Sequence, residues 1–125
     1  MSVPRPLPPC GRGVCVSTQA PSTDPLRRIE PLPFEAEAEV VMRAVLGVLG
    51  RVPRLRVLER DDVSVHAIVR SVWLRVPTDL EVRVDAVVGH VHLRAATPFA
   101  LRERSHSRVR ADELLRAFDR AIRTA

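Results

Sequence analysis

The side chains best suited to chemistry stand at alternate positions of two neighbouring segments near the centre of the chain. Glu81 and Arg83 alternate with apolar residues in the first segment, and His92 and Arg94 do so in the second. Successive side chains of a strand point to opposite faces, so these four residues would share one face of a sheet, called the polar face below. Guanidinium groups match carboxylate and phosphate oxygens bidentately, which suits this face to an anionic ligand.

Charge predicts how the two segments pair. A two-residue turn at 88–89 would set Arg83 against Arg94, and like charges directly opposite each other destabilise a sheet. A four-residue loop over 86–89 avoids this contact and keeps apolar residues opposite apolar ones. The predicted pairs are Glu81 with Arg94, Arg83 with His92, and Asp85 with His90.

The preceding segment supplies two more candidates for the polar face. A three-residue connection through 77–78 would set Arg75 opposite Glu81 and Trp73 opposite Arg83. A Trp on a wet sheet face needs cover, which the N-terminal segment or a second subunit would provide. We therefore predict a non-catalytic binding module for an anionic small molecule or a partner segment. The predicted ligand-binding residues are Trp73, Arg75, Glu81, Arg83, His92 and Arg94.

An acyl-transfer enzyme is the competing interpretation. Cys15 would be its nucleophile and His66 its base, with a carboxylate orienting the imidazole. Ser17 and His92 are alternatives for these two roles. The chain has no Gly-x-Ser-x-Gly elbow, and nothing in the spacing requires these residues to meet.

A metal site would be built from His66, His90, His92 and Asp85. His90 and His92 would project from the same face of a strand, but the chain contains no CxxC or HExxH pattern. Cys10 and Cys15 cannot form a structural zinc site unaided. A disulfide between them is geometrically possible, whereas a cytosolic context would keep both thiols reduced. We expect no metal and no cofactor, and the redox state of the pair is open.

Composition limits the partners. All 20 basic residues of the 125 are arginine, interspersed with 15 carboxylates, a pattern that a GC-rich bacterial genome explains. Four aromatic residues are too few for a base-stacking platform, so we expect no nucleic acid. No apolar run approaches the length of a membrane span. The N-terminal segment also lacks an apolar signal region, which predicts a cytoplasmic location.

The hydrophobic pattern predicts an α+β fold in the order α-β-β-β-β-α. Two helices would pack on one face of a four-stranded antiparallel sheet. Ser107 is the expected N-cap of the second helix. The apolar parity switches near Arg70 and Ser71, which predicts a bulge there. The expected helices are 34–49 and 108–123, and the expected strands are 54–60, 63–76, 79–86 and 90–97. Strand 54–60 would be the exposed edge through which a homodimer could form.

Proline marks the N-terminal part of the chain. Eight of the eleven prolines lie within the first 33 residues, which favours extended, irregular backbone. We predict that residues 1–11 form a flexible tail and that 12–125 form a single domain. Within that domain, residues 15–34 would pack against the sheet as an extended Pro-rich strap.

Several runs of the sequence resemble the domain-of-unknown-function family 1499. They are Cys15-Val16-Ser17-Thr18-Gln19-Ala20, Arg28-Ile29-Glu30-Pro31-Leu32-Pro33-Phe34, Val65-His66-Ala67, Asp79-Leu80-Glu81-Val82 and Gly89-His90-Val91-His92-Leu93-Arg94-Ala95. The resemblance covers about residues 12 to 120 and implies no assigned reaction. Arg94 and Arg108 keep the family's pattern, while the segment between them replaces its Gly and Ser-Asp pair.

Overall fold

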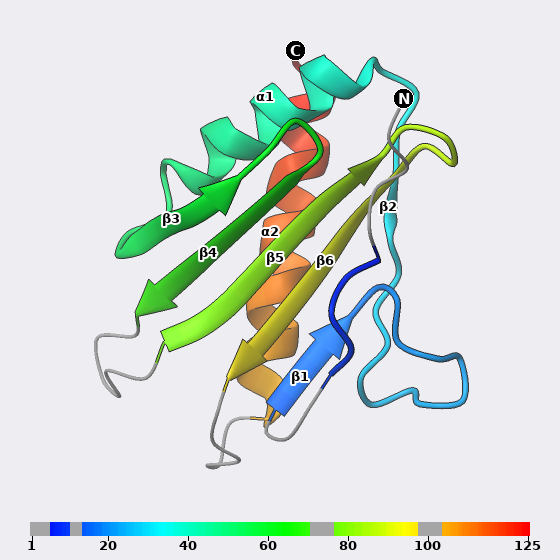
Figure 1. The fold of residues 1–125 in the computed structure, drawn as a ribbon, viewed down its shortest axis with the longest axis vertical. Helices are drawn as coiled ribbons and strands as arrows, with labels where there is room; N and C mark the ends of the chain where they lie inside the picture. The colour runs from blue at the N-terminus through cyan, green and yellow to red at the C-terminus, as the bar shows by residue number, and fades with distance from the viewer. Residues whose placement is uncertain (1–5, 11–13, 71–76, 98–103) are drawn as a thin grey trace.

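The computed structural model describes residues 6–10, 14–70, 77–97 and 104–125. The elements in chain order are β1 (Val14–Ser17), β2 (Leu32–Pro33), α1 (Ala38–Leu49), β3 (Leu55–Arg60), β4 (Ser64–Arg70), β5 (Pro77–Asp85), β6 (His90–Thr97) and α2 (Arg104–Arg123). They form one antiparallel sheet in the order β1-β6-β5-β4-β3, with β2 also paired to β6. Both helices lie behind this sheet in Figure 1. The fold is therefore α+β, as predicted.

The sheet has six strands, so the prediction of four was wrong. The two additional strands come from the segment that was expected to be an irregular strap. β1 pairs with one half of β6 and β2 with the other. Both are short, and neither shows a long apolar alternation. Their pairing depends on the free edge that β6 offers, which is a tertiary effect that local pattern does not encode.

The β5–β6 hairpin has the predicted register. Glu81 pairs with Arg94, Arg83 with His92, and Asp85 with His90. The four-residue loop 86–89 ends at Gly89, whose φ of 77° is in the left-handed region that favours glycine. The apolar residues that alternate with these polar pairs are buried on the helix side of the sheet. They are Leu80, Val82, Val84, Val91, Leu93 and Ala95.

The predicted pairing of β4 with β5 was wrong. Glu81 lies opposite His66 rather than Arg75, and Arg83 lies opposite Ser64 rather than Trp73. β4 ends at Arg70, which pairs with Pro77, so the connection is longer than three residues. Apolar residues alternate again past Arg70 with the opposite parity, and this pattern favoured one long strand with a bulge. Trp73, Arg75 and the bulge expected at Ser71 lie outside the described residues.

Both helices differ from prediction at their N-terminal ends. α1 begins at Ala38 instead of residue 34, because Leu32 and Pro33 pair with β6 and the Phe34 N–H donates to the Gly89 carbonyl at 2.8 Å. α2 begins at Arg104, so Ser107 lies inside the helix and is not its N-cap. Helical spacing of the apolar residues predicts a buried stripe of Ala38, Val41, Met42, Val45 and Leu49; of these only Ala38 is half-buried, and Val48 joins the buried side. It comprises Val41, Met42, Val45, Val48 and Leu49.

β3 is the exposed edge of the sheet, as expected for that segment. Its register shifts between Val57 and Glu59, which marks a β-bulge. Bulges and charged residues blunt an edge against pairing with another chain. The part of the chain that the structure describes contains no helix long and apolar enough to cross a membrane.

Candidate functional site: the polar face of the sheet

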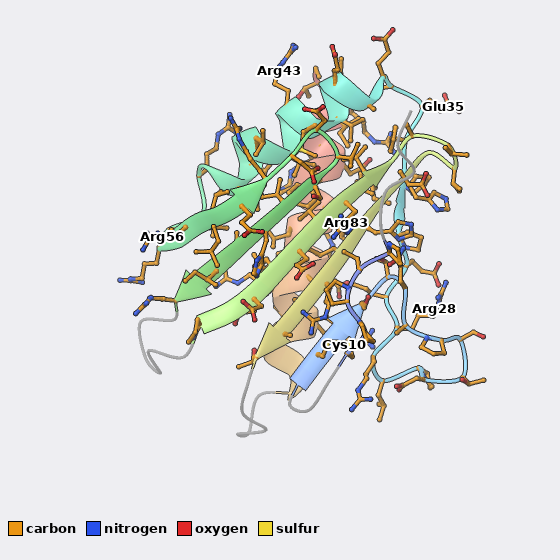
Figure 2. The ribbon with its side chains drawn as sticks, in the orientation of Figure 1. Cys10, Arg28, Glu35, Arg43, Arg56 and Arg83 are labelled. Atoms are coloured by element: carbon orange, nitrogen blue, oxygen red, sulfur yellow. A yellow bond between two sulfur atoms is a disulfide. The ribbon has the colours of Figure 1, made fainter. Side chains whose placement is uncertain are left out.

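Arg83 on β5 and Arg94 on β6 stand at the centre of the polar face. Arg83 is paired with His92, and Arg94 lies two residues further along β6, so the two arginines are diagonal neighbours. Residues in this relation are about 7–8 Å apart, which allows two guanidinium groups to reach one anion. Figure 2 shows Arg83 at the middle of the sheet, on the side facing away from the helices.

Each of these arginines has an unsatisfied donor. Nε of Arg83 and Nε of Arg94 are buried and have no hydrogen-bond partner among the described residues. Neither guanidinium forms an ion pair within the described ranges, where the pairs are Arg27–Asp24, His66–Asp79 and Arg123–Asp119. A buried donor without a partner costs about 1–3 kcal/mol. An acceptor supplied by a ligand would remove this penalty.

Thr18 fixes the imidazole of His92 beside the arginines. The Thr18 hydroxyl accepts a hydrogen bond from the Leu93 N–H at 3.1 Å and lies 2.9 Å from His92 Nδ1. A hydroxyl has one proton and two lone pairs, so Thr18 can donate to Nδ1 or accept from it, and the tautomer of neutral His92 decides which. In either tautomer this bond holds the ring in place beside the arginines.

Burial lowers the pKa of His92 below its ordinary value of 6.5. The nearby His90 and Arg28 act in the same direction, and Asp85 opposes them. The imidazole is therefore neutral at physiological pH.

The lowered pKa of His92 predicts a pH dependence of stability. The unfolded chain takes up a proton on His92 more readily than the folded protein, so unfolding is favoured as pH falls below 6.5. Above 6.5 both states are neutral at this residue and the effect disappears. Between pH 7.5 and pH 5.5, the free energy of unfolding measured in urea should fall less for His92→Gln than for the wild type. An equal loss in both proteins would contradict the assignment.

Carboxylates flank the arginines on the same face. Glu81 lies between His66 and Arg94 in the strand register, and Asp85 lies opposite His90. His66 Nε2 is 3.4 Å from Asp79 Oδ1. The polar face therefore has separate positive and negative positions instead of a uniform basic surface.

The structure does not bring the two catalytic candidates together. Cys15 is on β1 and His66 is on β4, with β6 and β5 between them. Three strand spacings correspond to about 14 Å. Cys15 is also bonded to Cys10 in a disulfide and is 4% exposed, so it presents no thiol to a substrate.

The N-terminal segment 6–10 packs beside the polar face. It runs along β1 in Figure 1, and its Leu7 is buried with its N–H donating to Gln19 Oε1 at 2.6 Å. A cavity of about 660 Å³ lies between this segment and 17–27. The boundary of the domain at residue 12 remains a prediction, although Leu7 and Cys10 contact the sheet region.

Sequence reasoning missed the residues that hold the loop after β1. Arg28 Nη1 donates to the Ala20 carbonyl at 2.8 Å. One nitrogen of Arg108 lies within 3.0 to 3.2 Å of the carbonyl oxygens of Pro25, Leu26 and Arg28. Carbonyl contacts of this kind follow from the folded path of the loop and leave no periodic signal. The available indication was the family resemblance, since Thr18 and Arg28 lie in the family-like runs and Arg108 keeps the family's pattern.

Comparison with known proteins identifies one family. A family described as protein of unknown function (DUF1499) has a model that matches residues 7–118. No curated protein and no solved structure matches the chain.

Proposed function

We propose that this chain, which belongs to the DUF1499 family of proteins of unknown function, is a non-catalytic binding module. Its polar face would hold the anionic group of a small molecule or of a partner segment. The observation that carries this proposal is the pair of buried, unpartnered Nε atoms on Arg83 and Arg94. Two guanidinium groups supply donors of the kind that recognise a carboxylate or phosphate, and the neutral imidazole of His92 lies beside them.

The flanking carboxylates restrict which ligands suit the face. An anion between Arg83 and Arg94 would lie close to Glu81, because Glu81 is directly opposite Arg94 in the strand pairing. A ligand of uniform negative charge would be repelled there, because like charges close together are unfavourable. The proposed ligand therefore joins one anionic group to a hydrogen-bond donor, as hydroxy acids and amino acids do.

Removing either arginine should weaken binding. Arg94→Gln and Arg83→Gln each delete one charge while keeping a polar stem, and we expect each to weaken the binding of a hydroxy acid by about tenfold or more. Isothermal titration of the purified chain with lactate, serine and inorganic phosphate would measure this. Arg56→Gln is the matched control, since Arg56 is exposed at the far edge of the sheet (Figure 2).

Native mass spectrometry of the protein as purified should precede the titration, because a retained ligand would reveal its own mass. Equal affinity of the wild type and both arginine variants for every anion would refute the proposal. The same spectra report the subunit count, which tests the alternative interpretation of a purely structural homodimer. A dimer without a ligand would favour a structural role, with the β3 edge as the place to substitute next.

The predicted cytoplasmic location is part of this proposal and conflicts with one feature of the structure. Cytosolic glutathione and thioredoxin reduce most disulfides, whereas oxidising compartments preserve them. Cys10 and Cys15 are joined in the structure. In the cytoplasm, this disulfide would have to stay oxidised in surroundings that reduce most disulfides.

A further inference from the structure

A groove between the two helices lies on the other side of the molecule from the polar face. Its main cavity has a volume of about 620 Å³, and a second cavity of about 260 Å³ continues it. The two share Val48, Arg51, Ala121 and Thr124. Figure 1 places both helices behind the sheet, so this groove is separate from the site on the near face.

Facing stripes of α1 and α2 give the groove an apolar floor. Small and branched side chains line it at helical spacing, which leaves space that a larger residue would fill. On α2 the floor residues are Leu114, Ala117 and Ala121, and on α1 and just after it they are Ala44, Gly47, Val48 and Val52.

Gly47 is the clearest sign that the space is not required for packing within the chain. Glycine inside a helix costs about 0.5–1 kcal/mol relative to alanine. A Cβ atom added at Gly47 would meet nothing within 4 Å, so no contact among the described residues explains the absence of a side chain. The helix gives up stability at this position and leaves the groove open.

Arginine dominates the rim of the groove. Arg51, Arg110 and Arg120 line the main cavity, and Arg43 lines its continuation and projects outward from α1 in Figure 2. Glu113 is the one acidic side chain in the described lining. None of these arginines forms an ion pair within the described ranges. The groove therefore combines an apolar floor with a positively charged rim whose arginines have no ion-pair partner among the described residues.

We propose that this groove binds a single-chain carboxylate amphiphile taken up as a free molecule. The acyl chain would lie along the floor past Gly47, and the carboxylate would contact Arg51, which lines both cavities. The volume is in the range of about 300–1,000 Å³ that is typical of small-molecule sites. A docked helix is about 10–12 Å wide and would need a much larger apolar surface, which favours the small ligand.

Titration of the full chain with monomeric dodecanoate tests the proposal. We expect saturable binding that weakens about tenfold or more in Arg51→Gln, which loses the charge shared by both cavities, and in Gly47→Leu, which fills the narrow end. Leucine is a good helix former, so Gly47→Leu should fold, and circular dichroism checks this. Arg116→Gln is the matched control, because Arg116 is exposed on α2 but does not line the groove.

Three outcomes would overturn the proposal. Dodecanol binding as tightly as dodecanoate would show that the rim plays no part. Unchanged binding in both Arg51→Gln and Gly47→Leu would place the amphiphile elsewhere. Binding only to anionic phospholipid vesicles would indicate a membrane surface instead of a free ligand. Arg83→Gln and Arg94→Gln should bind dodecanoate like the wild type, so failure here is distinguishable from failure of the polar-face site.

Discussion

Replacing Thr18 with valine is expected to lower the free energy of unfolding by about 2–4 kcal/mol, because one hydroxyl serves two partners. The Thr18 side chain is 2% exposed. It accepts the Leu93 N–H and bonds to His92 Nδ1. Valine has the same shape but leaves both groups without a partner. The orphaned backbone donor alone costs about 1–3 kcal/mol, and the lost bond to the imidazole adds to this.

The Thr18→Ser variant distinguishes the contribution of the hydroxyl to stability from that of the methyl group. It keeps both hydrogen bonds and removes one methyl, so we expect a cost of about 1 kcal/mol. Chemical denaturation of the three proteins at pH 7.5 gives the ranking. Nitrogen NMR of the imidazole provides a second readout, since Thr18→Val removes the hydrogen-bond partner of Nδ1 and should shift the resonance of that nitrogen. Equal stability of the valine and serine variants would show that the hydroxyl is not the important group.

The same threonine explains why β6 has a continuous partner along its outer edge. The Thr18 N–H donates to the Leu93 carbonyl at 3.0 Å, which extends the pairing just past the end of β1. β2 then resumes it at Val91. The edge that would otherwise be open is thus closed by backbone and by one side chain. This edge of the sheet is therefore formed by the short strands β1 and β2, and β3, whose residues are mostly exposed, forms the opposite edge.

The predictable parts of the fold are those that local pattern determines. The β5–β6 register followed from charge, because the wrong turn would have opposed Arg83 to Arg94. The buried stripe of α1 followed from helical spacing. The path of the chain before residue 34 could not be predicted, because β1 and β2 exist through contacts with β6, far away in the sequence.

The candidate site was predicted in part for the same reason. Arg83, His92 and Arg94 lie on one hairpin, so local alternation was sufficient to bring them together. Their support comes from Thr18, which is 74 residues from His92 in the sequence. His66 was placed opposite Glu81 by a β4–β5 pairing that the sequence did not predict. Contacts across long separations need the fold, and residue type alone does not reveal them.

Replacing Cys10 with serine is expected to lower the free energy of unfolding of the oxidised protein by about 2 kcal/mol. The Cys10–Cys15 disulfide closes a short loop with a sequence separation of 5, and short loops gain the least entropy from a cross-link. The substitution also frees segment 6–10, whose Leu7 is 6% exposed in the folded protein. Cys10 is preferred to Cys15 for this test, because Cys15 is buried and a serine there would need a new hydrogen-bond partner.

Urea unfolding with and without dithiothreitol measures the effect. Reduction should destabilise the wild type to the level of Cys10→Ser and should leave the variant unchanged; a wild type insensitive to reduction would refute a stabilising disulfide. Alkylation of thiols in intact cells extends the test to location. Two alkylated cysteines would agree with the predicted cytoplasmic protein. Two cysteines that resist alkylation would indicate an oxidising compartment. There the disulfide would keep segment 6–10 bonded to β1.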